Sequence, residues 1–360
     1  MLVVGARPNF MKAAPLMTGL QQESDRFDTV LIHTGQHYDH NLSQLFFDQL
    51  GMPQPDSYLG VGSGTHAHQT ARIMVELEKE LIQLKPDLVI VFGDVNSTLA
   101  ASVVCAKLCI KLAHVEAGLR SFDNTMPEEI NRIVTDRLSD YLFVTEDAGL
   151  VNLRNEGIPD RKVFFTGNIM IDSLVNHLEA AQGSQILEKL SLEPGSYVAM
   201  TMHRPANVDN ADTLTRLIQC VAEISEKIPV VFPCHPRTAK RIKEFGILDG
   251  DSRPGLTIEQ PLGYLDFLKL QAESKIVITD SGGIQEETTY LGIPCITMRT
   301  TTELLATVEV GTNTLCGSDP QKICAAVDRI LDGGGTEGQI PELWDGNTAS
   351  RIVEVLSQEL

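Results

Sequence analysis

The sequence predicts an α/β fold with two Rossmann-like domains, each built on a parallel sheet flanked by helices. Short runs rich in Val, Ile and Leu alternate with longer helical segments along all 360 residues. This length suggests two domains, and matching sets of strands fall in the two halves of the chain. Strands of a parallel sheet are buried on both faces, which explains why these runs are continuously apolar.

The predicted strands divide evenly between the halves. Those of the first half are 2–4, 29–33, 88–92, 112–115, 141–144 and 163–166. Those of the second half are 197–201, 230–233, 257–259, 276–279, 295–298 and 314–316. We expect an N-terminal domain at 1–167, a C-terminal domain at 168–347, and a last helix at 348–360 that packs back on the first domain. Ligands of open α/β sheets bind beyond the carboxyl ends of the strands, so two facing domains would place the site in the cleft between them.

Charge and composition exclude several classes of protein. The net charge of −19 argues against nucleic-acid binding, which needs a basic face. No apolar run reaches the roughly 18 residues of a membrane span, and the start lacks the charged region of a signal peptide, so we expect a cytoplasmic protein without a membrane partner. A phosphate-bearing substrate would be repelled by the overall field and would need local Arg and Lys side chains.

Cysteine and histidine patterns give no sign of a metal. The seven cysteines form no CxxC pair, and reduced structural thiols are the default. The nine histidines form no HExxH or comparable pattern. The sequence therefore predicts no metal site.

The stretch 276–288, IVITDSGGIQEET, has the pattern of an anion site. A buried strand, a turn of small residues and a helix start leave free backbone N–H groups at the positive end of a helix dipole. Gly282 and Gly283 allow a phosphate to approach the backbone, Ser281 can cap the helix or donate to phosphate, and Glu287 could accept sugar hydroxyls. The alternative is an ordinary strand-to-helix turn with a serine cap.

Charged residues follow other strands of the first half. Arg7 and Lys12 follow strand 2–4 and could face a phosphate, although a surface pair is the alternative. Asp94 and Glu116 end two further strands, and Glu128 begins a helix, where it is spaced to pair with Arg132. The alternatives are a helix cap for Asp94 and a solvated helix start for Glu128. Three carboxylates around one cleft would suit proton transfer.

The second half offers the complementary groups. His203 and Arg204 follow strand 197–201, and His235 follows strand 230–233. Arginine has the fork geometry that suits phosphate, and histidine can move a proton near neutral pH. A capping or core histidine is the alternative for either His alone.

Nine motifs spread over almost the whole chain make it resemble the non-hydrolysing UDP-N-acetylglucosamine 2-epimerase family. In order, they are GARPNFMK, TGQH, FGDVNST, HVEAGLR, MPEEINR, TGN, HRPAN, CHPR and TDSGGIQEE. The resemblance implies a fold of the glycosyltransferase-B type, a homodimer, a UDP-N-acetylhexosamine substrate and no cofactor. It also implies anti elimination of UDP to 2-acetamidoglucal, followed by re-addition of UDP after C2 is reprotonated on the opposite face.

The same resemblance implies roles for individual residues. Asp94, Glu116, Glu128 and His203 match the family's catalytic groups, with base and acid unassigned. Positions that match UDP or sugar contacts are Arg7, Lys12, His235, Phe267, Ser281, Gly282 and Glu287. Gln36, His37 and Gln69 lie near the site where some bacterial members bind an activating substrate molecule; ordinary loop polarity is the alternative.

One segment departs from the family pattern. Leu304 stands where the family usually has an arginine near the phosphates, and Leu305 replaces a proline. Three other functions stay open: a hydrolysing epimerase, a glycosyltransferase of the same architecture and, because of Leu304, a nucleotide-sugar sensor without turnover.

Overall fold

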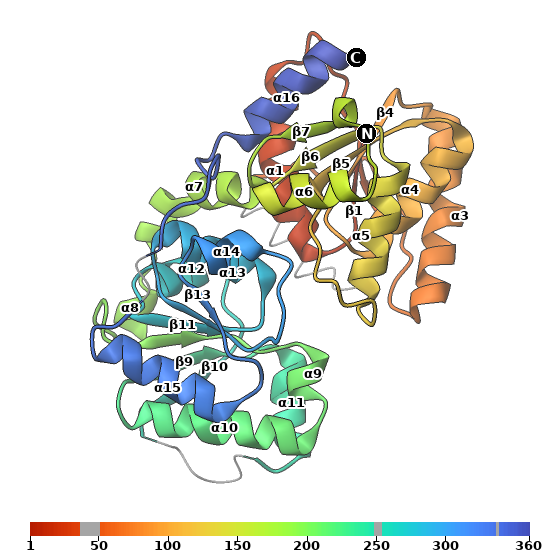
Figure 1. The fold of residues 1–360 in the computed structure, drawn as a ribbon. Coiled ribbons are helices and arrows are strands. Elements are labelled where there is room, and N and C mark those ends of the chain that lie inside the picture. Colours follow the sequence, from red (N-terminus) through yellow and green to blue (C-terminus); the bar gives the residue numbers. More distant parts are fainter. Residues whose placement is uncertain (37–50, 248–253, 336–337) are drawn as a thin grey trace. The chain divides into compact units, whose positions relative to one another are not determined.

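The chain folds into two compact units, each an α/β assembly (Figure 1). The computed structural model describes residues 1–36, 51–247, 254–335 and 338–360. Unit 1 comprises Met1–Val175 and Glu342–Leu360, and unit 2 comprises Asn176–Pro341. Helix α7 (Ile169–Gln182) contains the border between them. No helix in the described part of the chain is both long and apolar enough to cross a membrane.

Unit 1 is built on one parallel sheet with the strand order β3-β2-β1-β4-β5-β6-β7. Its strands are β1 (Leu2–Val4), β2 (Leu31–His33), β3 (Ser57–Tyr58), β4 (Leu88–Phe92), β5 (Lys111–Ala117), β6 (Tyr141–Val144) and β7 (Val163–Phe165). The central strands carry apolar side chains on both faces and are buried throughout, as the helices on both sides of a parallel sheet require.

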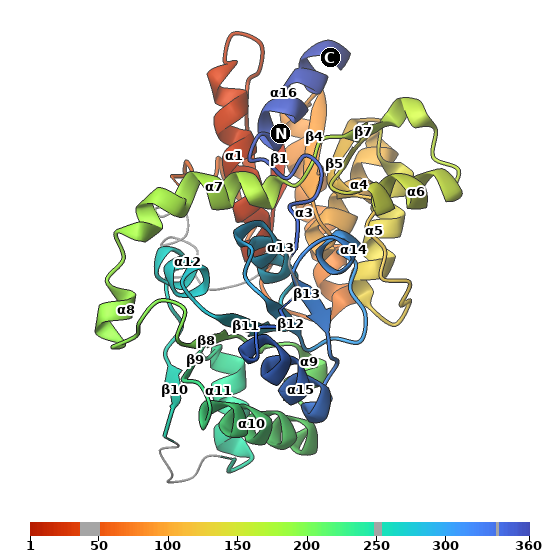
Figure 2. The same cartoon turned by 60° about the vertical axis from the view of Figure 1, so that its left-hand side comes forward.

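Helices connect these strands. They are α1 (Arg7–Gln22), α3 (His66–Leu84), α4 (Asn96–Leu108), α5 (Pro127–Leu138), α6 (Asp147–Asn155) and the 3₁₀ turn η1 (Asp160–Lys162). Helices α3, α4 and α5 pack side by side. The last helix, α16 (Thr348–Glu359), packs against α1. Figure 2 shows the two helices next to each other, near the N-terminus.

Unit 2 repeats the scheme with the parallel order β10-β9-β8-β11-β12-β13. The strands are β8 (Val198–Met200), β9 (Val230–Pro233), β10 (Leu256–Glu259), β11 (Ile276–Thr279), β12 (Cys295–Thr297) and β13 (Asn313–Leu315). The helices are α8 (Ile186–Lys189), α9 (Pro205–Val208), α10 (Ala211–Ser225), α11 (Pro236–Glu244), α12 (Tyr264–Ala272), α13 (Gly282–Leu291), α14 (Leu305–Glu309) and α15 (Pro320–Leu331). Its largest apolar core joins α10 and α15 to the central strands.

The parallel α/β architecture predicted from the strand–helix alternation is confirmed. Strands β1, β4, β6, β9 and β11 have the predicted bounds, and the other predicted strands differ by one or two residues at their ends. Strand β3 was not predicted, because two residues at a sheet edge give no apolar run.

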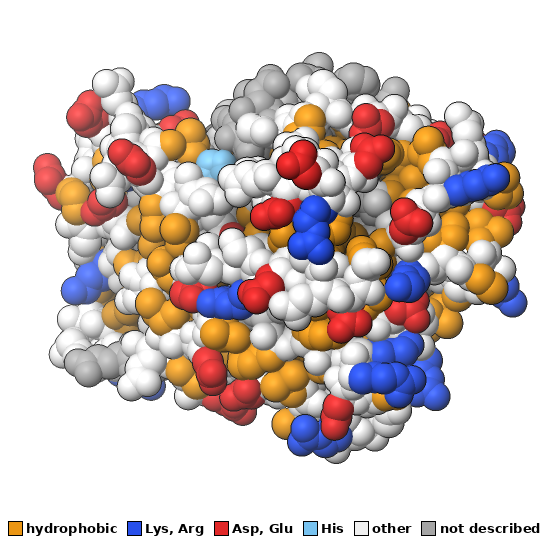
Figure 3. Space-filling model, turned by 90° about the horizontal axis from the view of Figure 1, so that it is seen from above, with side chains coloured by type: hydrophobic (Ala, Val, Ile, Leu, Met, Phe, Trp, Pro, Cys, Tyr) orange, Lys and Arg blue, Asp and Glu red, His pale blue; other side chains and the backbone are white. Residues whose placement is uncertain are grey.

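The surface carries charges of both signs despite the net charge of −19. On the face shown in Figure 3, acidic and basic side chains are interspersed with apolar ones. Among the described residues, no group of three or more His, Cys, Asp or Glu side chains is arranged to hold a metal ion.

Candidate active site

The charged residues predicted in unit 1 lie at the carboxyl ends of adjacent strands. Strands β1, β4 and β5 are neighbours in the sheet, so the segments that follow β1 and β4 lie beside the end of β5. Lys12 lies in the second turn of α1, Asp94 follows β4, and Glu116 is the next-to-last residue of β5. Arg7 is the exposed first residue of α1. The sheet order thus gathers groups that are far apart in the sequence.

Glu116 is held in an unusual backbone conformation. Its φ is +74°, and the register of β5 shifts between Val115 and Ala117, which marks a β-bulge. Its carboxylate forms a buried ion pair with Lys12. A Cβ added at Gly93 would lie 3.0 Å from Glu116 Oε2 and 3.2 Å from Lys12 Nζ. A side chain at Gly93 would therefore crowd the ion pair, and the positive φ of +60° at this position also favours glycine.

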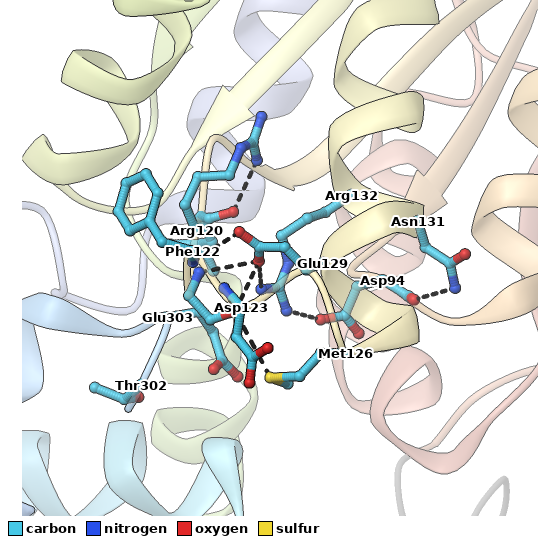
Figure 4. Close-up of polar contacts among 12 residues, drawn as sticks. Asp94, Arg120, Phe122, Asp123, Met126, Glu129, Asn131, Arg132, Thr302 and Glu303 are labelled. Carbon is cyan, nitrogen blue, oxygen red and sulfur yellow. Dashed lines mark hydrogen bonds and ion pairs between the residues drawn. The ribbon is translucent and has the colours of Figure 1, made fainter. Parts of the chain in front are cut away.

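Asp94 is held by a buried arginine (Figure 4). Its Oδ2 pairs with Nη2 of Arg132, whose Nη1 donates to Glu129 Oε2 at 2.6 Å. The side chain of Asn131 donates to the Asp94 backbone oxygen at 2.8 Å. The expected pair between Glu128 and Arg132 is wrong, because the guanidinium points to Glu129 and Asp94 instead.

Glu128 differs from the other two carboxylates. It is half-buried in the first turn of α5, and it has no hydrogen-bond or ion-pair partner within the described ranges. Asp94 and Glu116 each face a cation, whereas Glu128 does not. Of the three groups, Glu128 is therefore the least constrained by neighbours of this unit.

Two glutamines predicted near an activating site lie together at the start of α4. Gln36 Oε1 accepts hydrogen bonds from the N–H and the hydroxyl of Ser97 at 3.0 and 2.7 Å. Gln69 donates to the Gln36 backbone oxygen at 3.0 Å and accepts from Asn96 at 2.8 Å. Hydrogen bonds within unit 1 therefore hold Gln36 and Gln69 next to each other. His37 lies outside the described residues.

In unit 2, His203 is oriented by a buried carboxylate. Its Nδ1 lies 3.0 Å from Oδ1 of Asp280, and the His203 side chain is 43% exposed. Asp280 also accepts from the backbone N–H of Arg204 at 2.9 Å and from Asn207 Nδ2 at 2.9 Å. Burial alone would raise the pKa of Asp280, but the hydrogen bonds and charge of His203, with those other donors, lower it overall. The pair fixes the ring and leaves Nε2 for proton transfer.

Arg204 and His235 lie beside this pair. Arg204 Nε donates to the backbone oxygen of Asp280 at 2.9 Å. His235 is the N-cap of α11 and accepts from the backbone N–H of Arg237 at 3.2 Å. The rings of His203 and His235 have centroids 6.0 Å apart. His235 thus has both the capping role given as an alternative and a position next to His203.

The start of α13 matches the predicted anion site in part. Ser281 is the N-cap residue, but its side chain makes no capping hydrogen bond, which corrects that expectation. Its backbone N–H instead donates to Thr279 Oγ1 at 3.0 Å. Gly282 and Gly283 form the first turn, and a Cβ added at Gly282 would meet nothing closer than 3.5 Å. A side chain at Gly282 would therefore make ordinary van der Waals contact with Glu303 and Leu304.

The remaining predicted contacts in unit 2 lie behind this helix start. Glu287 is buried and accepts from Tyr264 at 3.3 Å and Gln271 at 2.9 Å. Phe267 is half-buried against the apolar cluster that includes Ile284. The structure thus anchors Glu287 by hydrogen bonds and Phe267 by packing.

Leu304 lies next to Gly282. It is only 2% exposed, and its Cδ1 lies 3.7 Å from the position of a Cβ added at Gly282. The nearby Arg299 is paired with Glu303, with Nη2 2.5 Å from Oε2. An apolar side chain therefore occupies the position where the family pattern has a cation.

Sequence reasoning did not single out Asp280 or Glu129, and it expected another partner for Arg132. Asp280 directly follows β11, a position that could have marked it. Glu129 and Arg132 lie on one face of α5, one turn apart, and that spacing was the available signal. Which partner Arg132 takes depends on the packing of α5 against the strand ends, which local spacing does not reveal.

The two parallel sheets, with polar groups at their carboxyl ends, define an α/β protein of the glycosyltransferase-B type. The family model for UDP-N-acetylglucosamine 2-epimerase matches residues 20–357, and the chain belongs to this family. The resemblance stated from the motifs is thereby confirmed.

Relatives and solved structures agree with this assignment. The chain is 41% identical to the UDP-N-acetylglucosamine 2-epimerase of Methanocaldococcus jannaschii, over 99% of this chain and 98% of the relative. It is 39% identical to the UDP-2,3-diacetamido-2,3-dideoxy-D-glucuronate 2-epimerase of Pseudomonas aeruginosa, with the same coverage. The Methanocaldococcus jannaschii enzyme in complex with UDP-GlcNAc and UDP superposes with a TM-score of 0.91 at 41% identity, covering 99% of both chains. The Neisseria meningitidis enzyme bound to UDP-GlcNAc gives 0.89 at 29% identity, also covering 99% of both chains.

Proposed function

We propose that the protein is a non-hydrolysing epimerase that interconverts UDP-N-acetylglucosamine and UDP-N-acetylmannosamine. The observation that carries this proposal is the set of three carboxylates at the carboxyl edge of the unit 1 sheet: Asp94, Glu116 and Glu128. Family membership supports a 2-epimerase, and these carboxylates supply groups that can move a proton at C2.

The reaction proceeds in two halves. A carboxylate removes the C2 proton, the C2–H electron pair forms the C1=C2 bond, and the C1–O bond breaks with its electrons leaving on UDP. The products are 2-acetamidoglucal and UDP. In the second half C2 accepts a proton on the opposite face and a UDP phosphate oxygen attacks C1. Glu128 is half-buried and has no ion-pair partner among the described residues, so we propose it as the group that exchanges the proton. Asp94 and Glu116 are each held by a cation.

Unit 2 supplies the groups for UDP. The start of α13 at Gly282 and Gly283 offers backbone N–H groups, and Arg204 offers a guanidinium. His203, fixed by Asp280, can donate a hydrogen bond to the departing diphosphate. No redox step occurs, so the proposal requires no nicotinamide. We also propose a homodimer in the cytoplasm, which light scattering in solution tests for its oligomeric part.

The experiment that tests this function follows UDP-N-acetylglucosamine by proton NMR with the purified protein. We expect UDP-N-acetylmannosamine to appear until an equilibrium mixture remains. Release of free N-acetylmannosamine with stoichiometric UDP would indicate a hydrolysing epimerase instead. Transfer of the sugar to an added acceptor would indicate a glycosyltransferase, and calorimetric binding without turnover would indicate a sensor.

A second substrate is favoured by two observations. A relative of nearly equal similarity is named for a 2,3-diacetamido glucuronate, and Leu304 alters the segment beside Gly282. The same NMR assay with that UDP-sugar decides between the two. A higher kcat/KM for the UDP-uronate than for UDP-N-acetylglucosamine would identify the uronate as the substrate.

A further inference from the structure

We propose that one face of α5 is the positioning element of the site, and that Glu129, Arg132 and Asp136 set the geometry of Asp94 and Glu116 without contacting substrate. This inference rests on the proposed function, which makes Asp94 and Glu116 catalytic groups. The three residues are spaced so that they share one helix face, and all three are buried. Each makes hydrogen bonds to a segment that carries, or adjoins, a candidate catalytic group.

Asp136 holds the chain on both sides of Glu116. Its Oδ1 lies 2.6 Å from His114 Nδ1, before Glu116 in the sequence. Its Oδ2 accepts from the Gly118 backbone N–H at 3.0 Å and lies 2.7 Å from Arg120 Nη2, after Glu116. The Asp136 carboxylate thus holds the residues on both sides of the bulge at Glu116.

The pinned conformation is unfavourable by itself. A left-handed φ of +74° places the Cβ of a non-glycine residue close to its own backbone. Such a residue persists only where its surroundings determine it. The bonds from Asp136 to either side of Glu116 provide that determination, so the direction of the Glu116 carboxylate depends on Asp136.

The same network reaches the loop that carries Asp94. His114 Nε2 lies 2.8 Å from the backbone oxygen of Gly93, the residue before Asp94. A carbonyl oxygen and a carboxylate both accept hydrogen bonds, so each ring nitrogen of His114 faces an acceptor and the ring links Asp136 to Gly93. Burial would raise the pKa of Asp136, but His114 and Arg120 lower it overall, and the carboxylate stays charged. Arg120 also pairs with the exposed Glu156 at 2.7 Å.

The first turns of α5 hold Asp94 from the other side (Figure 4). Arg132 joins Asp94 to Glu129. Glu129 in turn accepts from the backbone N–H groups of Ser121 and Phe122, each at 2.9 Å. Phe122 has a φ of +57° and its side chain is exposed. Helix α5 therefore fixes a second left-handed residue as well as Asp94.

The decisive variant is Asp136→Asn, which keeps the shape but replaces one acceptor oxygen with a donor. We expect kcat to fall by about 100-fold, the loss typical of a small misplacement of a reacting group. KM and the UDP dissociation constant should change much less than kcat, because Arg204 and the start of α13, which we propose hold UDP, lie in unit 2.

Asp172→Asn is the matched control. Asp172 is also a buried carboxylate of unit 1, and it accepts backbone hydrogen bonds from Thr348 at 3.0 Å and Ala349 at 2.7 Å. We expect it to lower the Tm comparably while kcat stays near wild type. A kcat loss in Asp136→Asn no larger than in this control would overturn the proposal.

Two further measurements cover the case in which Asp136→Asn folds poorly or the substrate differs. Arg132→Gln should lose kcat and Arg132→Lys should recover part of it, whereas equal losses would count against positioning by charge. A crystal structure of Asp136→Asn should show Glu116 leaving positive φ and separating from Lys12. An unchanged Glu116 would overturn the inference whatever the enzyme acts on. If wild type turns over no UDP-sugar, the proposed function fails and this structural comparison still decides the positioning claim.

Discussion

His203 Nδ1 lies 3.0 Å from Asp280 Oδ1. This contact joins the segment after β8 to the residue after β11, and the two strands are neighbours in the sheet. Asp280 is buried and accepts further hydrogen bonds from two backbone N–H groups and from Asn207. The carboxylate therefore orders the whole segment that carries His203 and Arg204.

This pair gives unit 2 a defined dependence on pH. Because the folded pKa of Asp280 lies below the ordinary value of 3.8, the charged carboxylate stabilises the fold above that value, and this stability is lost as pH falls through the folded pKa. The Tm of wild type should therefore drop more steeply than that of Asp280→Asn between about pH 5 and about pH 3. Calorimetry of both proteins, with Asp328→Asn in the surface pair with Lys227 as control, measures this. Equal slopes for wild type and Asp280→Asn would refute the assignment.

The buried ion pair of Lys12 and Glu116 should be costly to break from one side. Lys12→Met leaves a buried carboxylate without its cation, which typically costs about 3–5 kcal/mol. Lys79→Met breaks a pair with Glu76 that is largely exposed and should cost no more than about 1 kcal/mol. Urea unfolding measures both values. Adding Glu116→Gln to Lys12→Met should restore part of the stability, and a failure to do so would contradict the ion-pair account.

Gly282→Ala tests the helix start in unit 2. An added Cβ meets ordinary van der Waals distances of 3.5 and 3.7 Å, so the Tm should stay close to wild type. A phosphate that lies against this glycine would lose its contact with the backbone, and the affinity for UDP should fall by about 10-fold or more. Gly335→Ala, where the nearest atom is 3.8 Å away, is the control and should bind UDP normally. Unaltered UDP affinity in Gly282→Ala would move the phosphate site elsewhere.

Leu304→Arg tests the departure from the family pattern. A guanidinium beside Gly282 should tighten UDP binding by about 10-fold, the worth of one charge-assisted hydrogen bond. Removing a buried leucine should cost about 2 kcal/mol of stability, so the Tm falls while affinity rises. Leu304→Met keeps the site apolar and should leave the calorimetric dissociation constant unchanged. The same constant in Leu304→Arg as in wild type would count against a phosphate at this position.

Periodic patterns were enough to predict the strands, whereas side-chain partners were not. Buried runs such as Leu88–Phe92 and Ile276–Thr279 are strands with the predicted bounds because their apolar character is local. Strand β3 was missed because Ser57–Tyr58 pairs with β2 at an edge and has no apolar run of its own.

The candidate site shows the same division. The positions of Asp94, Glu116 and His203 after strands could be read from the sequence, because a strand end is a local feature. The partner of Arg132 could not, since Glu128, Glu129 and Asp94 were all within reach and the packing of α5 decided among them. The position of Ser281 before α13 could likewise be read from the sequence, whereas the absence of a capping bond from its side chain could not.

The most direct test of the central claim is proton NMR of UDP-N-acetylglucosamine incubated with the protein in heavy water. Removal and return of the C2 proton predict deuterium at C2 in both the glucosamine and the mannosamine nucleotide, with traces of UDP. A mannosamine nucleotide that keeps its original C2 hydrogen, or a substrate that never exchanges it, would contradict the elimination route.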